Sequence, residues 1–263
     1  MKNRNTVLTG GRFKLAAGVV AMAVVMWAHA ATSDSWWVDV ANDRAADVRN
    51  ELARGADPNA VNDEELPSLM LAIRSDAWQV YDALLAHRQI DVNIENKHGE
   101  TPLMYLALLG ETKRAAELIK RGAQVNRLGW TPLHYAASKG QVETARMLIE
   151  NGAIVHAPAP DGTTPMMMAA FSGDRETVQL LLDHGADPTA INLNKHTAAD
   201  WARERRHFDL AQELDAIAKR IVAQREGRAV APSPASKPSV TTPGSGGSSG
   251  SRYFDLKRFE EDD

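Results

Sequence analysis

The chain has 263 residues, 44% of them apolar and 24% charged, which is typical of a folded protein with a core of ordinary size. Without the first 30 residues, 26 basic residues stand against 34 acidic ones, so the sequence excludes the basic surface that nucleic-acid binding needs. Because it has no cysteine, it also excludes disulfides, thiolate catalysis and cysteine-ligated zinc.

Residues 1–30 have the three-part pattern of a secretory signal peptide. Four basic residues precede an apolar run from Leu15 to Trp27, and Ala28-His29-Ala30 follows as a small-x-small cleavage pattern. The run has 13 residues, fewer than the roughly 20 that span a bilayer. We therefore expect a cleaved signal of the general secretory type and a periplasmic or secreted protein without stable membrane insertion. The alternative is an uncleaved anchor that holds the chain on the inner membrane, with the rest outside the cytoplasm.

A four-residue pattern recurs every 30 to 34 residues in the middle of the chain. A Gly-Ala pair recurs in phase with it, beginning at Gly55, Gly122, Gly152 and Gly185, and each pair closes an apolar stretch. Two marks with one period indicate an internal repeat. The tetrads are Pro-Ser-Leu-Met at 67–70, Thr-Pro-Leu-Met at 101–104, Thr-Pro-Leu-His at 131–134, Thr-Pro-Met-Met at 164–167 and Thr-Ala-Ala-Asp at 197–200.

Each repeat predicts two short helices and an extended hairpin, which we call a finger. Threonine caps the first helix, and proline follows where an amide hydrogen would have no partner. The second helix has apolar residues at helical spacing, for example Val178, Leu181 and Leu182. The glycine after it suits the left-handed conformation that ends many helices.

The segment Thr-Pro-Leu-His-Tyr-Ala-Ala at 131–137, followed by Leu-Ile-Glu-Asn-Gly-Ala at 148–153, resembles the ankyrin repeat. The resemblance implies an all-α repeat solenoid, a stack of helix-turn-helix units with β-hairpin fingers, over residues 36–224. We expect six units, at about 36–62, 63–96, 97–128, 129–161, 162–194 and 195–224. The first and last lack the Thr-Pro start and carry polar residues, as solenoid caps do.

Residues 229–263 change composition to proline, serine, threonine and glycine and end in an aromatic, charged segment from Arg252 to Asp263. Such a composition buries too little apolar surface to offset the entropy of folding, so we expect a disordered tail. A docking role for its last residues is the alternative.

One finger is shorter than the others, because five residues separate Asn126 from Thr131 where the other fingers use eight. We expect a notch in the row of fingertips, with the Trp130 indole at its edge. The alternative is a tolerated deletion, with Trp130 packed on the neighbouring finger.

The resemblance also implies that a partner binds on the fingers and on the concave face, which the first helices line. Large apolar residues at outward positions, among them Trp130, favour a protein interface because exposed apolar groups and tryptophan are common anchors. Carried over position by position, the expected partner-binding residues are Leu66, Arg74, Glu100, Leu108, Trp130, Lys139, Thr163, Phe171 and His196.

Signals for catalysis, cofactors or metals are weak. His134 occupies the histidine position of the repeat, which the family uses for hydrogen bonds between units, and no second group is spaced to orient it as a base. Met166, Met167 and Met168 suit a soft core filler better than a copper site. We expect no enzyme activity, cofactor or metal. The alternative function is a periplasmic metal handler or enzyme that uses His134, His196 and the cluster Met166–Met168.

The sequence therefore predicts an extracytoplasmic scaffold, monomeric, that binds another protein. The resemblance to small exported ankyrin proteins of bacteria implies two possible settings, neutralisation of a toxic effector protein or support of a periplasmic catalase. A purely structural envelope spacer, docked by its tail, is a third interpretation.

Overall fold

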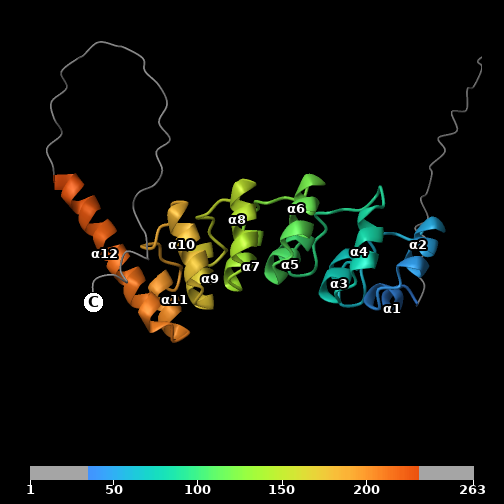
Figure 1. The fold of residues 1–263 in the computed structure, drawn as a ribbon, viewed down its shortest axis with the longest axis horizontal. Helices are drawn as coiled ribbons and strands as arrows, with labels where there is room; N and C mark the ends of the chain where they lie inside the picture. Colours follow the sequence, from blue (N-terminus) through green and yellow to red (C-terminus); the bar gives the residue numbers. More distant parts are fainter. Residues whose placement is uncertain (1–34, 231–263) are drawn as a thin grey trace, which may run out of the picture.

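The computed structural model describes residues 35–230, with side chains described up to residue 227. The expected signal peptide, residues 1–30, lies outside these residues, as does the expected tail from residue 231 onwards. The described residues form helix pairs 1 to 6, which stand side by side in one elongated row (Figure 1). The odd-numbered helices lie along one side of the row, which we call the inner face, and the even-numbered helices along the other. The pairs are α1 (Trp36–Ala41) and α2 (Ala45–Ala53); α3 (Ser68–Arg74) and α4 (Trp78–Leu85); α5 (Pro102–Leu109) and α6 (Thr112–Lys120); α7 (Pro132–Ser138) and α8 (Val142–Glu150); α9 (Pro165–Ser172) and α10 (Arg175–Asp183); α11 (Ala198–Glu204) and α12 (Phe208–Val230).

The inner helices begin where the tetrads predict. Thr164 caps α9 through its hydroxyl, which accepts a hydrogen bond from the Met167 amide, and Pro165 takes the first helical position. At the start of α11, Thr197 and Asp200 form a capping box, in which each residue caps the other. The Asp200 backbone amide donates to the Thr197 hydroxyl, and the Thr197 backbone amide donates to the Asp200 carboxylate at 2.9 Å. Local chemistry therefore sets where each unit starts.

One hydrophobic core runs along the whole row, from Trp36 in α1 to Ile217 in α12. No pair buries its apolar stripe alone, because each inner helix packs on the inner helices beside it. At the N-terminal end the indole of Trp36 is fully buried and donates to the Ser68 hydroxyl of α3 at 2.9 Å, and the Asp43 carboxylate accepts from the Val80 amide of α4 at 2.8 Å. The first pair is thus fixed to the second by core packing and by hydrogen bonds.

Three asparagines at one finger position join consecutive pairs, and we call each an asparagine clamp. The side-chain amide of Asn93 donates to the Gly122 carbonyl at 3.0 Å, and its side-chain oxygen accepts from the Gln124 backbone amide at 2.8 Å. These two bonds join pair 2 to pair 3. Asn59 and Asn126 make the equivalent two bonds one unit before and one unit after. Each clamp fixes the end of an outer helix to the finger of the preceding unit.

Two details differ from the sequence-based expectation. The fingers contain turns and one isolated bridge, Val61 to Pro67, and no strand is assigned within residues 35–230. Helix α12 is also longer than the 195–224 unit allows, because it has 23 residues and includes the first two residues of the expected tail, 229–230. The ion pair of Arg225 with Asp187, at 3.0 Å, holds the extended part of α12 against the finger of pair 5.

Candidate protein-binding surface

Two residues expected at the binding surface are buried, so their expected exposure is wrong. Leu66 belongs to the core, and its backbone exchanges hydrogen bonds with Asn62 across the finger, which turns the side chain inward. Thr163 is 1% exposed; its hydroxyl donates to the Asp161 carboxylate at 2.9 Å, and its carbonyl lies 3.1 Å from Nε2 of His134. Both side chains are used by the stack and are not available to a partner.

Glu100 is half-buried and is bound by its own neighbours. Its carboxylate accepts hydrogen bonds from the Tyr135 hydroxyl at 2.7 Å, the Asn96 amide at 2.7 Å and the Tyr105 hydroxyl at 3.2 Å. Burial acts to raise the pKa of this carboxyl, but the three hydrogen bonds outweigh it and lower the pKa below its ordinary value. Glu100 therefore stays charged, and its first role is to join α5 to α7.

The expected charged and polar residues at the ends of the inner helices are exposed. Arg74 ends α3, where its guanidinium lies 3.4 Å from the Glu64 carboxylate, and Lys139 follows α7. His196 stands before α11 with its ring edge-on to Trp201, the centroids being 6.3 Å apart. Arg74 also borders a hollow of about 240 Å³ between the first two fingers, lined in addition by Glu64, Leu66, Asn96, Lys97, His98 and Tyr105. These residues remain candidates for polar contacts with a partner.

Trp130 stands at the base of the short finger and is 37% exposed. Its indole meets the ring of His134 edge to face, with the centroids 5.2 Å apart, so the contact with this buried ring fixes the orientation of the indole. In the same short finger, Arg127 pairs with Glu95 at 2.9 Å and donates to the Gly99 carbonyl, both of which lie in the preceding finger. Trp130 is therefore a fixed and partly exposed indole, and the notch expected in the row of fingertips stays a prediction.

Phe171 lies in the next unit, at the end of α9. Trp201 meets it edge to face at 5.5 Å, and the guanidinium of Arg205 lies 4.4 Å from its ring centre. Leu108 takes the equivalent position on α5 and is half-buried. The structure therefore leaves Leu108, Trp130 and Phe171 partly exposed on the inner face, and the two aromatic rings are held by neighbouring side chains.

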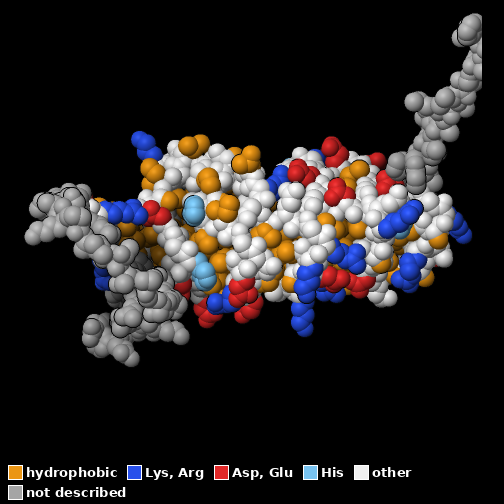
Figure 2. All heavy atoms as spheres, turned by 90° about the horizontal axis from the view of Figure 1, so that it is seen from above, with side chains coloured by type: hydrophobic (Ala, Val, Ile, Leu, Met, Phe, Trp, Pro, Cys, Tyr) orange, Lys and Arg blue, Asp and Glu red, His pale blue; other side chains and the backbone are white. Residues whose placement is uncertain are grey.

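The sequence-based list missed an apolar surface on the fingers of the C-terminal half. Leu128 is 98% exposed and Leu193 77%, and their neighbours in the adjacent fingers are also exposed and apolar. Along the upper edge of the view in Figure 2, apolar side chains gather over α8 and α10, whereas acidic ones gather over α4 and α6. The sequence contains a signal for this surface, because apolar residues recur at two equivalent positions of successive fingers. Pro158 and Ile191 occupy the first position, and Pro160 and Leu193 the second.

Of the histidine and methionine residues of the alternative function, His134, Met166 and Met167 are buried in the stack, whereas His196 is exposed. Met166 and Met167 are buried in the core, and His134 is fully buried, with Nδ1 2.9 Å from the Thr131 hydroxyl. Burial lowers the pKa of His134 to about 4, so the ring is neutral at neutral pH. This agrees with the inter-unit hydrogen bond that the resemblance implied. Within residues 35–230, no group of three His, Asp or Glu side chains is placed to hold a metal.

A bilayer-spanning helix would need to be both long and apolar, and none of the helices of the described stretch meets that condition.

Comparisons with known proteins agree with the repeated units. The family model described as Ankyrin repeats (3 copies) matches residues 39–128, 69–159, 110–192 and 155–220, which together cover most of the chain. The human protein Transient receptor potential cation channel subfamily A member 1 is 34% identical over 77 residues, which are 29% of this chain and 7% of that protein. The chain thus spans a small part of that relative. On the stacked helix pairs, the capped tetrads and the family match, the chain belongs to the ankyrin-repeat family.

Proposed function

We propose that the inner face of this stack, around Trp130 and Phe171, binds another protein outside the cytoplasm. Ankyrin repeats are generally protein–protein interaction modules and typically form non-enzymatic scaffolds. The observation that carries the site is that two aromatic rings stay partly exposed while the chain itself holds them in place.

Preorganisation is the physical reason for this choice. A partner that contacts Trp130 or Phe171 immobilises little, because His134 already fixes the first ring and Trp201 and Arg205 the second. Less side-chain entropy is then lost on binding. Exposed Arg74, Lys139 and His196 lie at ends of the inner helices and supply polar contacts at the rim.

The test is affinity capture from the exported fraction with the tagged chain, followed by identification of the partner and measurement of its affinity. We expect Trp130→Ala with Phe171→Ala to weaken binding about tenfold or more, because anchor residues contribute over 1 kcal/mol each. Arg146→Ala, an exposed change on α8, is the matched control and should bind as the unchanged chain does. Equal affinity of the double variant would remove the inner-face proposal.

Export is part of the same proposal and has its own test, because the signal pattern of residues 1–30 lies outside the described structure. Mass spectrometry of the protein from the exported fraction should find an N-terminus close to residue 31. A retained Met1 together with recovery in the membrane fraction would favour the anchored alternative.

For the biological setting, we propose either neutralisation of a toxic effector protein or support of a periplasmic catalase. The identity of the captured partner separates the two. Catalase activity that falls in a deletion strain and is restored by the chain would favour the second. Binding that depends only on residues 231–263 would instead favour the envelope-spacer interpretation.

A further inference from the structure

Exposed apolar side chains follow one another along the fingers between pairs 3 and 6, and we call this surface the fingertip patch. It consists of Leu128, Pro158, Pro160, Ile191 and Leu193, all exposed. Neighbouring fingers are in contact here: a Cβ on Gly129 would lie 3.5 Å from the Pro160 ring, and the Leu193 amide donates to the Asp161 carbonyl at 2.8 Å. Exposed apolar clusters of this kind mark binding sites.

Near its C-terminal end, α12 contacts the finger at one end of this patch. Arg225, near the end of α12, pairs with Asp187 at 3.0 Å and donates to the Thr189 hydroxyl at 3.1 Å. Asp187 and Thr189 lie at the base of the finger that carries Ile191 and Leu193. The part of α12 around Arg225 therefore lies beside one end of the fingertip patch.

The sequence beyond α12 contains one apolar segment that suits the patch. Of its large apolar residues, all but Val240 lie close together, at Tyr253, Phe254, Leu256 and Phe259. The 21 residues between, 231–251, are rich in proline, serine and glycine. A linker of this length spans about 25 Å on average if it behaves as a flexible chain. Three fingers set by helices that pack about 8–10 Å apart cover a similar length.

We propose that residues 252–259 dock on the fingertip patch of their own chain and cover it until a partner displaces them. Short tethers give effective concentrations on the order of millimolar. A segment that binds the patch in trans with a dissociation constant of about 0.1 mM is then docked about nine-tenths of the time. The apparent affinity of any competing ligand for the patch falls about tenfold. This inference concerns a different surface from the inner face around Trp130 and Phe171 and stands independently of the proposed function.

The test uses paramagnetic broadening in the full chain, because the chain has no cysteine and one can be introduced for labelling. A nitroxide on Ser251→Cys should remove most of the methyl signal of Leu128, Ile191 and Leu193, and leave that of Val38 in α1 unchanged. In the same labelled chain, Phe254→Ser with Phe259→Ser should restore the fingertip signals, since the tether is unaltered. Leu193→Ser with Ile191→Ser should restore the Leu128 signal.

Three outcomes would overturn the proposal. Equal broadening with and without the two phenylalanines would mean that the tether alone brings the label close. Broadening that is strongest away from the fingertips would place the segment elsewhere. In a mixture of isotope-labelled chain without nitroxide and nitroxide-labelled chain without isotope, broadening of the same methyls would assign the patch to a second copy. Unchanged signals in the mixture support docking within one chain.

Discussion

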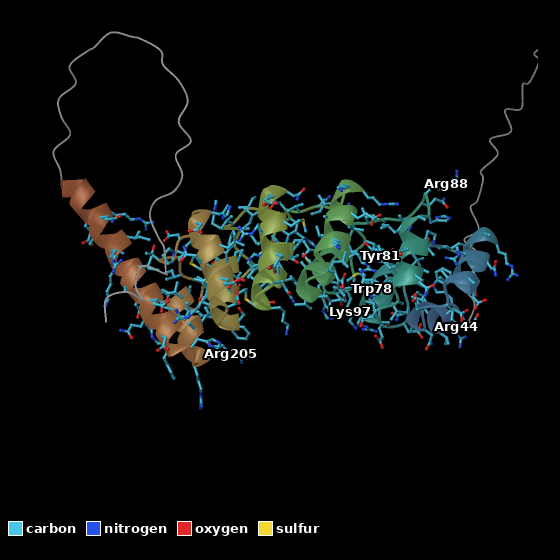
Figure 3. All side chains as sticks on the ribbon, in the orientation of Figure 1. Arg44, Trp78, Tyr81, Arg88, Lys97 and Arg205 are labelled. Carbon is cyan, nitrogen blue, oxygen red and sulfur yellow. The ribbon has the colours of Figure 1, made fainter. Side chains whose placement is uncertain are left out.

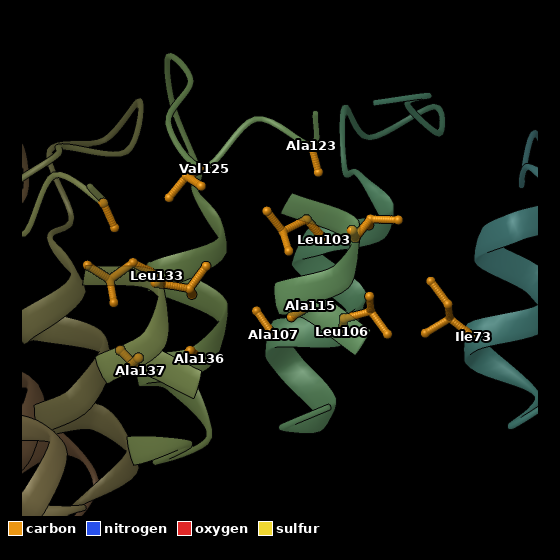
Figure 4. Packing of buried hydrophobic residues seen from close by; sticks show 14 of the residues in the cluster. Ile73, Leu103, Leu106, Ala107, Ala115, Ala123, Val125, Leu133, Ala136 and Ala137 are labelled. Carbon is orange, nitrogen blue, oxygen red and sulfur yellow. The ribbon is translucent and has the colours of Figure 1, made fainter. Parts of the chain in front are cut away.

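Two junctions in this stack are built differently, although the repeats on both sides share one frame. Between pairs 2 and 3, the facing inner helices carry Ile73 on α3 and Leu106 on α5, both fully buried (Figure 4). Between pairs 4 and 5, the equivalent positions are alanines, Ala136 and Ala137 on α7 and Ala169 and Ala170 on α9. The backbones of α7 and α9 accordingly approach more closely than those of α3 and α5.

The wider junction has additional contacts between its outer helices. Trp78 and Tyr81 lie between α4 and α6 (Figure 3), and the Arg114 guanidinium lies 3.9 Å from the Trp78 ring centre. Arg121 donates to the Leu85 carbonyl, and the Asn93 clamp closes the finger side. Large side chains thus fill the wider space between pairs 2 and 3, whereas alanines between pairs 4 and 5 let the helices approach each other.

The narrower junction has no asparagine clamp. The residue at the clamp position is His156, which makes no equivalent bond within residues 35–230. The bond between His134 and the Thr163 carbonyl and the one between the Leu193 amide and the Asp161 carbonyl join these pairs instead. The comparison teaches that the size of the side chains between inner helices sets the spacing of units. The hydrogen bonds that join the units then differ between a wide and a narrow junction.

The largest expected effect is at the wide junction. Leu106→Ala leaves a cavity between α3 and α5 and should cost about 2–5 kcal/mol of unfolding free energy. Leu109→Ala on the same helix is the matched control, because Leu109 is 46% exposed and should change stability by less than about 0.5 kcal/mol. Denaturant unfolding of both variants measures the difference. Equal losses would mean that Leu106 does not fill that junction.

The next effect is a pH dependence at the narrow junction. His134 has its pKa lowered to about 4 by burial, below the ordinary value of 6.5, so the unfolded chain binds more protons between these two values. Stability is therefore full above pH 6.5 and should fall by about 2 kcal/mol from pH 7 to pH 5. His134→Gln should remove this part of the slope, and His156→Gln, an exposed change in the same unit, should keep it. A slope that survives in His134→Gln contradicts the assignment.

A smaller effect is expected at the clamps. Asn93→Ala removes two hydrogen bonds between pairs 2 and 3 and should cost about 1–2 kcal/mol, since their partly exposed groups can bind water instead. His156→Ala at the same finger position should change the unfolding free energy by less than about 0.5 kcal/mol. If both alanine variants unfold at the same denaturant concentration, the clamps do not strengthen the junction.

The smallest expected effect is an increase in stability. His156→Asn places a fourth clamp opposite the Gly185 carbonyl and the Asp187 amide, the positions that match the bonds of Asn126, and should add about 1 kcal/mol. Thermal unfolding with and without the substitution measures it. A variant no more stable than the unchanged chain would show that the close helix packing here leaves the clamp no room to form.

Much of the fold was predictable because its signals are local. Threonine caps, proline at the first helical position and the Gly-Ala pairs each act within a few residues, so the helix starts at Thr101, Thr131 and Thr164 follow from the tetrads. The length of α12 did not follow, because neither its continuation into residues 229–230 nor the contact of Arg225 with Asp187 in another unit has a local sequence signal.

The site was predicted less well, because the exposure of its residues depends on contacts with the adjoining units. Leu66 and Trp130 occupy one repeat position, yet the first is buried and the second partly exposed. The difference lies in their neighbours: Leu66 joins the core beneath a full-length finger, whereas Trp130 stands at the base of a short one. Position within a repeat predicts which residues line the inner face, and the adjoining unit decides which of them reach the surface.

The central claim is that the units form one packed stack, with its binding surface in place before a partner arrives. Hydrogen exchange of the free full chain tests it most directly. We expect the amides of α3, α5, α7 and α9 to exchange only through openings that cost several kcal/mol, with no partner added. Exchange of those amides at the rates of an unfolded chain, slowed only when a partner binds, would contradict it.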